Sequence, residues 1–527
     1  MKVSPPVPTR APSSARAAGP ARFLIPAALV AVLVVAFVFR FLTTSDLWLD
    51  EALTVNIAKL PLSELQHALR QDGAPPLYYV MLHGWIQVFG SGDVAVRALS
   101  GVLGLVMIGL SYVAGLRFGS DDRERRWAAW AAVLVVASSP YAIRYSTEAR
   151  MYMLAMVLVL FGYLAVARMI EQGPSIGRFA AVALTTAALL YTQYWSLFLL
   201  AVVGGLMVLR AWRAPELERR QPRMVLLAMF TGGLLFLPWV SNFLYQLAHT
   251  GTPWDTPATP PTAAALGIID FVGGKTVEGW SIIPVAFVLA LLALAGRAAG
   301  RYQISVDLRT VPGVRWEWLV GAATLMLGLV ASYLGGTGFQ ARYAAVMYPL
   351  FALAVAAGIL VITDHRIRVG VLVFIVAIGF VGGVRNAHTN RTQSSQVIGI
   401  VNAEAKPGDV VVFCPDQLGP DGNRLVDPSL GVREVVYPTF AGPKLVDWVD
   451  YADRNSRAQP KQFGDRVLQA AAGHTVWVVW APRYKTFQGQ CESMMNTIGA
   501  QRPGATDRVT ADESIYEFMG LLQFPAG

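Results

Sequence analysis

The chain has 527 residues, of which 54% are hydrophobic and only 15% are charged, and its mean hydropathy is +0.47. Because an ordinary soluble domain carries about 25% charged residues, this composition excludes a wholly soluble protein and indicates that most of the chain lies in lipid. A net charge of +9 would suggest nucleic-acid binding in a soluble protein, but here the arginines gather in loops between apolar segments, so membrane topology explains them better.

The first segment, residues 1–22, is basic and rich in proline, alanine and serine, which predicts a disordered tail. The apolar segment that follows, residues 23–42, is too long for the core of a signal peptide, and no clear small-residue cleavage site comes after it. We therefore expect the tail to stay attached and to lie in the cytoplasm.

Apolar segments long enough to cross about 30 Å of hydrocarbon recur along the chain, and each must be helical because lipid cannot satisfy backbone polar groups. We predict about eleven spans, at residues 23–42, 94–116, 127–143, 151–168, 179–195, 197–210, 224–240, 281–298, 317–334, 344–362 and 369–384. Arginine-rich loops alternate along this series, and the positive-inside rule places them in the cytoplasm. The N-terminus is then cytoplasmic, and everything after residue 384 lies outside a bacterial plasma membrane.

Residues 75–89 are apolar but short for a span, and counting them as one would place the arginine-rich loops outside. We expect a helix on the outer membrane surface instead, where Tyr78, Tyr79 and Trp85 suit the headgroup region. Leucines at helical spacing in residues 62–70 predict a second interfacial helix.

Beyond residue 384 the composition changes to alternating strand-like and helix-like pieces, which predicts a three-layer α/β domain over residues 385–527, after a catalytic membrane domain over residues 23–384. The predicted strands cover residues 409–413, 475–480 and 514–519, and the predicted helices cover residues 394–405, 463–472 and 492–500. Cys414 and Cys491 both lie in this domain. An oxidising compartment favours a disulfide between them over two buried thiols.

Three carboxylates, Asp46, Asp50 and Glu51, directly follow the first apolar segment. One of them could cap an interfacial helix, but capping hardly explains three acids beside a membrane. An ionisable group at this depth is a candidate functional residue by default, and a carboxylate can take a proton from a hydroxyl group.

Two arginines in the predicted outer loops run against the usual bias of arginine toward the cytoplasm. They are Arg150, in RYSTEARMY (144–152), and Arg342, in FQARY (339–343). Glu148 is expected to pair with Arg144 at i,i+4 spacing, which leaves Arg150 free to bind an anion. Guanidinium groups bind phosphate through two N–H groups, so the two arginines and the acids predict a lipid-phosphate site; contact with lipid headgroups is the alternative for each arginine singly.

Weaker candidates are Lys275, which would add charge near the phosphate from an outer loop, and Asp72, which fits a turn at least as well as a substrate contact. The histidines and cysteines show no spacing typical of a transition-metal site, and no nucleotide-binding glycine motif is present. We expect no cofactor and leave a divalent metal open.

Five motifs resemble, in their order, those of the GT-C glycosyltransferases, and most closely the bacterial relatives of protein O-mannosyltransferases and of the aminoarabinose transferase that acts on lipid A. They are WLDEA (48–52), DGAPPLYY (72–79), VRALS (96–100), YSTEARMYML (145–154) and FQARY (339–343). The match leaves the C-terminal domain out, and the Ala/Arg/Val-rich composition resembles that of actinobacterial proteins.

The resemblance implies an inverting glycosyltransferase that uses a polyprenyl-phosphate sugar, with mannose as the first candidate and arabinose as the second. The acceptor would be a hydroxyl of a glycolipid, polysaccharide or protein outside the cytoplasm. It implies Asp50 as catalytic base with Glu51 as its paired acid, and Arg150 and Arg342 for the charge of the leaving phosphate. Further candidates are Tyr343 and Lys275 for the donor phosphate, and Asp72, Tyr78, Tyr145, Glu148 and Tyr152 for the substrates. Ala74 stands where the family usually has histidine, so a contact made by that imidazole is in doubt.

Two other functions are alternatives to this one. A lipid-sugar flippase or transporter would place polar groups near the membrane midplane and show repeated halves, whereas these acids cluster at one surface and no internal repeat is visible. A non-catalytic glycolipid-binding protein is the second alternative, and the combination of Asp50 with both arginines argues against it.

Overall fold

The computed structural model describes residues 21–252, 255–310 and 313–527, without the side chains of residues 21–24 and 217. The predicted disordered tail, residues 1–22, therefore lies outside the described residues except at its last two positions, where helix α1 (Ala21–Phe39) begins.

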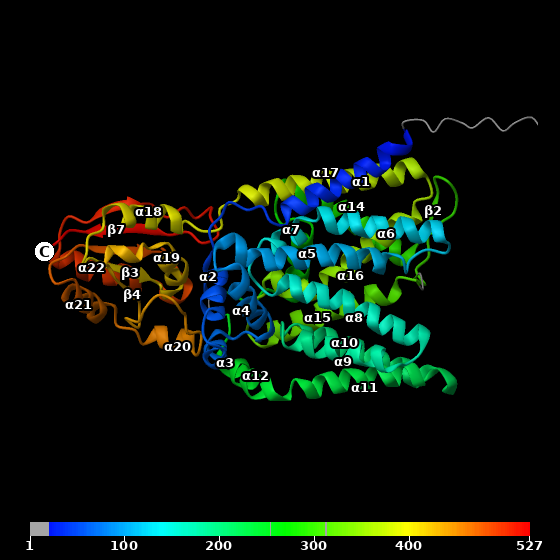
Figure 1. Cartoon of the computed structure of the whole chain (residues 1–527), viewed down its shortest axis with the longest axis horizontal. Helices are drawn as coiled ribbons and strands as arrows, with labels where there is room; N and C mark the ends of the chain where they lie inside the picture. The colour runs from blue at the N-terminus through cyan, green and yellow to red at the C-terminus, as the bar shows by residue number, and fades with distance from the viewer. Residues whose placement is uncertain (1–20, 253–254, 311–312) are drawn as a thin grey trace, which may run out of the picture.

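Long helices lie side by side and form one end of the molecule, while a mixed sheet with its own helices forms the other (Figure 1). Each of the eleven predicted spans coincides with a helix. These helices are α1, α5 (Asp93–Gly115), α6 (Asp122–Ser138), α8 (Tyr152–Gln172), α9 (Ile176–Leu190), α10 (Ser196–Arg213), α11 (Arg220–Leu235), α14 (Val277–Ala295), α15 (Arg315–Leu334), α16 (Tyr348–Gly358) and α17 (His365–His388).

Six helices of the described chain are long and apolar enough to cross a membrane, which is fewer than the eleven predicted. A seventh span results if α11 and α12 (Leu237–His249), which are bent by 72° relative to each other, count as one. Helices α9 and α16 and the apolar part of α1 are shorter, and α6 opens with the charged residues Asp122–Arg126. The chain is thus a multi-pass helical membrane protein with six or seven candidate spans.

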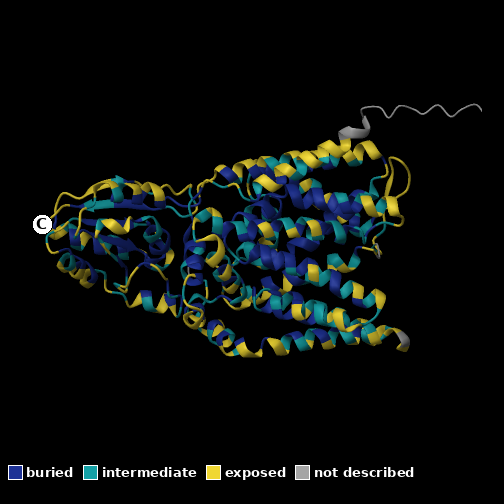
Figure 2. Cartoon of the chain, viewed as in Figure 1, coloured by how far each residue is buried: buried dark blue, intermediate teal, exposed yellow. Residues whose placement is uncertain are grey.

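Apolar side chains cover the outside of the helical part as well as its inside. Leu184, Phe230 and Leu234 are exposed, while Met156 and Leu353 are buried between helices. Figure 2 shows exposed residues along the outermost helices and buried ones between them. Lipid solvates exposed leucine and phenylalanine as well as a protein interior does, so these faces suit a membrane.

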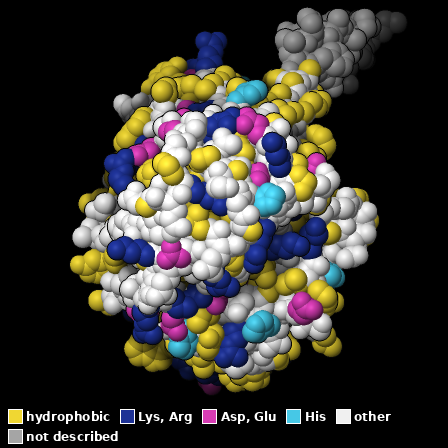
Figure 3. Space-filling view, turned by 90° about the vertical axis from the view of Figure 1, so that its left-hand side faces the viewer, with side chains coloured by type: hydrophobic (Ala, Val, Ile, Leu, Met, Phe, Trp, Pro, Cys, Tyr) yellow, Lys and Arg dark blue, Asp and Glu magenta, His cyan; other side chains and the backbone are white. Residues whose placement is uncertain are grey.

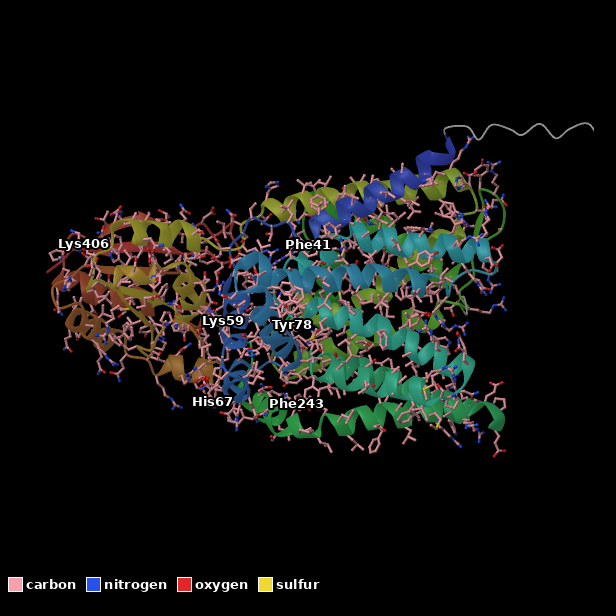
Figure 4. The ribbon with its side chains drawn as sticks, viewed as in Figure 1. Phe41, Lys59, His67, Tyr78, Phe243 and Lys406 are labelled. Carbon is pink, nitrogen blue, oxygen red and sulfur yellow. A yellow bond between two sulfur atoms is a disulfide. The ribbon has the colours of Figure 1, made fainter. Side chains whose placement is uncertain are left out.

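Shorter helices form a layer between the long helices and the sheet region (Figure 1). They are α2 (Leu49–Ala58), α3 (Leu62–Asp72) and α4 (Leu77–Phe89), so both predicted interfacial helices are present as helices. Figure 4 shows Lys59, His67 and Tyr78 in this layer. The arginine-rich hairpin β1–β2 (Gly296–Ala298 and Ile304–Val306) lies at the opposite end of the long helices (Figure 1).

The C-terminal sheet has five strands in the order β4 (Arg433–Val436), β3 (Val410–Cys414), β5 (Val476–Trp480), β7 (Gly520–Phe524) and β6 (Thr506–Val509). Strands β4, β3 and β5 are parallel, and β7 runs antiparallel to both of its neighbours. The remaining elements of this part are α18 (Ser394–Glu404), α19 (Gly419–Leu425), α20 (Tyr451–Ser456), α21 (Pro460–Ala471) and α22 (Gln490–Gln501).

Alternation along strand β3 builds three layers, as the sequence predicts. Val410 and Val412 pack in one cluster with α21 and α22, whereas Val411 and Phe413 pack in another with α18. The outer face at this end carries basic and acidic side chains (Figure 3), as a surface in water does.

The predicted last strand, residues 514–519, is wrong. Ile515 N–H donates to the Asp512 carbonyl in a turn, and the strand begins only at Gly520. Strands β4 and β6 were not predicted, because both lie at sheet edges and carry charged residues that interrupt any apolar run. The predicted disulfide is confirmed, since Cys414 of β3 is bonded to Cys491 of α22.

Candidate active site

A cavity of about 910 Å³ lies where the long helices meet the sheet region. Both parts of the chain line it. The polar and aromatic residues of its wall include Trp48, Asp50, Asp72, Arg150, Tyr152, Gln193, Trp195, Arg342 and Tyr343, and from the C-terminal region Gln417, Trp448, Arg483, Tyr484, Lys485, Tyr516 and Glu517. A cavity of this size and composition suits a ligand with both polar and apolar parts.

Asp50 lies in the first turn of α2 and faces two guanidinium groups. Its Oδ2 is 3.3 Å from Nη1 of Arg342 and 3.8 Å from Nη2 of Arg150. The three side chains are only 11–16% exposed, so their charges interact in a weakly screened environment. In the described chain, Asp50 is the only carboxylate that pairs directly with these two guanidinium groups.

Arg150 precedes α8 and is held by uncharged groups of the layer helices. Its Nη1 donates to Thr54 Oγ1 at 2.8 Å and to the Tyr79 hydroxyl at 3.2 Å. The Tyr79 hydroxyl in turn donates to Asp72 Oδ2 at 2.6 Å. Burial raises the pKa of Asp72, and the charge of Arg150 and the bond from Tyr79 oppose that rise. Asp72 therefore belongs to the same network as Asp50.

Arg342 belongs to the short 3-10 helix η2 (Ala341–Val346) and stacks on aromatic rings. Its guanidinium carbon is 5.3 Å from the centre of the Trp48 ring and 5.7 Å from that of Tyr343. The Nε groups of Arg342 and Arg150 are buried and have no hydrogen-bond partner in the described part of the chain. Two buried donors without partners favour an anion that would bind them both.

Glu51 lies behind the site and is fully buried. Its carboxylate forms two bonds with Arg97, at 2.6 and 2.8 Å, accepts the Ala149 N–H at 2.8 Å, and lies 3.4 Å from Arg391. Burial would raise its pKa, but Arg97 and Arg391 outweigh this and lower the pKa to about 2. Glu51 is not among the described residues that line the cavity, so its contacts fit a structural role better than contact with a substrate.

The other predicted residues divide into two groups. Tyr152 and Tyr343 line the cavity. Glu148 pairs with Arg144 at 2.7 Å, as predicted, Tyr145 packs on Tyr152, and the Tyr78 hydroxyl lies 3.0 Å from Ser100 Oγ. Glu148, Tyr145 and Tyr78 are not among the described residues that line the cavity.

Lys275 does not reach the site. It is exposed in the loop between α13 (Pro260–Phe271) and α14, near Asp270, and does not line the cavity in the described chain. Its placement next to the phosphate is therefore corrected: the loop directs this lysine to the surface. No group of three or more His, Cys, Asp or Glu side chains is arranged to hold a metal ion in residues 21–252, 255–310 and 313–527.

Several residues of the site were not predicted as such. Thr54 follows the motif WLDEA by two residues, and Tyr79 is the last residue of DGAPPLYY, where its ring was expected in the headgroup region rather than beside Arg150. Arg97 stands in the quoted motif VRALS, but its partner Glu51 is a long-range contact. Tyr516 and Glu517 come from the other end of the chain, and no local pattern signals that they line the cavity together with Asp50.

The fold is similar to that of ArnT from Cupriavidus metallidurans. The crystal structure of ArnT in the apo state has a TM-score of 0.59 at 14% identity, and the match covers 95% of this chain and 98% of that one. The structure of ArnT bound to undecaprenyl phosphate has a TM-score of 0.52 at 13% identity, covering 96% and 98%. No protein-family model and no curated protein matches the sequence.

The structural match extends through the C-terminal region, which the motif resemblance left out. At this identity the comparison establishes the fold alone. The chain therefore has an ArnT-like fold over nearly its whole length.

Proposed function

We propose that this protein is an inverting glycosyltransferase that moves a sugar from a polyprenyl-phosphate donor to a hydroxyl group. The observation that carries the proposal is the position of Asp50, between Arg150 and Arg342, on the wall of a cavity that both parts of the chain line. The fold supports a lipid-linked donor, because ArnT with the same fold has been solved with undecaprenyl phosphate bound.

The two arginines would bind the donor phosphate. Their free Nε groups provide two donors for an anion. As the phosphate takes over contacts of Arg342 and Arg150, the Asp50 carboxylate is released from its ion pairs and can accept a proton. Tyr343 and Tyr152 line the same cavity and would lie beside the phosphate.

The sugar is then transferred in a single displacement at its anomeric carbon. Asp50 accepts the proton of the acceptor hydroxyl, whose oxygen forms a bond to the anomeric carbon. The bond between that carbon and the phosphate oxygen breaks, and its electron pair leaves with the polyprenyl phosphate, whose charge the two guanidinium groups stabilise. A general base contributes about 10²–10⁴-fold to such a step, and preorganised charges contribute more.

Glu51 would act at a distance from the reacting atoms. Its buried contacts with Arg97, Arg391 and Ala149 fix the first turn of α2, so we assign it the positioning of Asp50. Asp72 would hold Arg150 in place through Tyr79.

We further propose that all eleven predicted segments cross a bacterial plasma membrane, with the tail in the cytoplasm and residues 385–527 outside as a domain of their own. The position of the arginine-rich hairpin β1–β2, opposite the sheet region, supports this orientation (Figure 1). Mannose is the first candidate sugar and arabinose the second, on the motif resemblance. The acceptor would be a cell-envelope glycolipid, polysaccharide or protein.

The experiment is to incubate the purified protein with radiolabelled polyprenyl-phosphate sugars, mannose and arabinose first, and with membrane glycolipid and polysaccharide acceptors. We expect transfer from one donor with release of polyprenyl phosphate. Binding of the lipid without transfer from any donor, or movement of the lipid across vesicles, would contradict the proposal and favour a binding protein or a flippase.

A further inference from the structure

The start of α2 is capped by a residue from the far end of the chain. The Leu49 N–H donates to Oε1 of Glu517 at 3.0 Å and to Oε2 at 3.2 Å. The first N–H groups of a helix have no partner within the helix, and a side-chain oxygen that accepts from them satisfies these donors. In the described chain, Trp48, the residue before α2, makes no side-chain capping bond. Glu517 supplies the cap that the neighbouring sequence lacks.

Glu517 is itself fixed by main-chain bonds. Its N–H donates to the Arg391 carbonyl at 3.0 Å, and its carbonyl accepts the Gln393 N–H at 3.1 Å. The Arg391 N–H donates to Ser45 Oγ at 2.8 Å, and the Arg391 guanidinium reaches Glu51. The segment that holds Glu517 is therefore tied to both sides of the turn that carries Asp50.

The neighbouring residue extends this contact to the site. The ring of Tyr516 meets the ring of Trp48 edge-on, at 5.1 Å between centres, and Trp48 lies under the guanidinium of Arg342. Tyr516, Glu517, Trp48 and Asp50 all line the same cavity. The segment that carries Glu517 therefore packs directly against the start of α2, next to Asp50.

We propose that Glu517 is a positioning residue, whose side chain caps α2 and holds Asp50 where it can accept the proton of the acceptor hydroxyl. This inference rests on the proposed function. It makes the C-terminal region a part of the reaction machinery, in addition to any contact that the region makes with an acceptor.

The surroundings of Glu517 identify the variant that should preserve its role. Burial first, and then the neighbouring carboxyl of Asp421, to which Glu517 is hydrogen-bonded, raise the pKa of Glu517. Thr392 Oγ1 donates to Asp421 Oδ2 at 3.1 Å and fixes that partner. Glutamine at position 517 keeps an oxygen for the Leu49 N–H and an N–H for Asp421, whereas alanine keeps neither.

The test measures kcat and the donor KM for transfer from the active polyprenyl-phosphate sugar. We expect Glu517→Ala to lower kcat about 10- to 100-fold with little change in donor KM, because a small misplacement of a reacting group costs this much. Glu517→Gln should retain kcat within about threefold. Glu404→Ala, which removes an exposed glutamate that pairs with Arg508 in the same region, is the matched control and should behave as wild type.

A second variant removes the other end of the bond. Leu49→Pro deletes the N–H at the first helical position, where proline is accepted, and the extended backbone of Trp48 suits a residue before proline. We expect a similar loss of kcat, and the double variant Leu49→Pro/Glu517→Ala should lose no more than the worse single variant, since both remove one bond. If Glu517→Ala does not fold, the kcat of Leu49→Pro alone tests the inference.

Either of two results would overturn the inference. One is a kcat per folded molecule that is equal for Glu517→Ala and Glu404→Ala, and the other is a fully additive loss of kcat in the double variant. Asp50→Asn is measured in parallel. An active Asp50→Asn would contradict the proposed base, whereas an inactive Asp50→Asn with a fully active Glu517→Ala would contradict only the role of Glu517.

Discussion

The carboxylate of Asp50 lies 3.3 Å from Nη1 of Arg342, although the two residues come from opposite ends of the helical part of the chain. The contact brings the proposed proton acceptor and a proposed phosphate-binding group to one wall of one cavity. The same arginine stacks on Trp48, two residues before Asp50, so its position is fixed from two sides.

Replacing Arg342 by lysine tests the phosphate site. Lysine keeps the charge but loses the planar pair of donors and the stacking on Trp48, so Arg342→Lys should weaken binding of polyprenyl phosphate about 10- to 100-fold. Titration of the purified protein with polyprenyl phosphate measures this. Arg117→Lys, at an exposed pair with Glu171, is the control and should bind as wild type does. Equal affinity of the two variants would contradict the assignment of Arg342.

Replacing Glu51 tests the buried ion network behind the site. Glu51→Gln leaves Arg97 and Arg391 with no compensating charge in a buried position, and should lower the free energy of unfolding by about 3–5 kcal/mol. Glu171→Gln, which breaks the exposed pair with Arg117, should cost less than about 1 kcal/mol. Thermal unfolding in detergent compares the two variants. A similar small effect of both would show that Glu51 does not hold α2 in place.

The disulfide should stabilise the C-terminal region. Cys414 and Cys491 are 77 residues apart, and closing a loop of that length removes about 4 kcal/mol of chain entropy from the unfolded state. We expect a reducing agent to lower the unfolding temperature of the wild type and to leave that of Cys414→Ala/Cys491→Ala unchanged. If thiol labelling shows complete reduction without any shift in the wild type, this expectation fails.

A buried carboxyl in the C-terminal region gives a pH dependence. Burial raises the pKa of Asp416 to about 7, despite the hydrogen bond from Tyr451. The unfolded chain releases this proton near pH 4. Between about pH 4 and 7 the folded state therefore binds more protons than the unfolded state, and this group makes stability fall as the pH rises.

Asp416→Asn should remove this contribution. Its unfolding temperature should fall less than that of the wild type between pH 4 and 7, while the exposed control Asp465→Asn should follow the wild type. Parallel pH profiles for all three proteins would show that Asp416 is ionised when folded.

The sequence predicts the helices, the three-layer C-terminal region and the meeting of Asp50 with Arg150 and Arg342, because each rests on a strong local signal. Three of these signals can be recognised without a structure: long apolar runs, valine-rich strands, and arginines in loops on the outer side, against the usual bias of arginine toward the cytoplasm. It does not predict that Glu51 faces away from the cavity, because adjacent residues of a helix point in different directions and only the position of Arg97 decides which faces the site.

Contacts between segments that are far apart in the sequence could not be predicted either. Glu517 reaches Leu49 only because the last strand begins at Gly520 and places residues 516–518 against the start of α2. The strand predicted from the sequence, residues 514–519, begins too early and covers the segment that contains Glu517. Lys275 was misplaced for the same reason, since its loop has no pattern that fixes where it points.

The central claim is that Asp50 is the base that activates the acceptor. The most direct measurement is the transfer rate of purified Asp50→Asn from the polyprenyl-phosphate sugar that the wild type uses, with polyprenyl phosphate binding measured on the same preparation. We predict a rate lower by about 10²–10⁴-fold with the lipid still bound. Transfer at the wild-type rate by a folded Asp50→Asn protein would contradict the account.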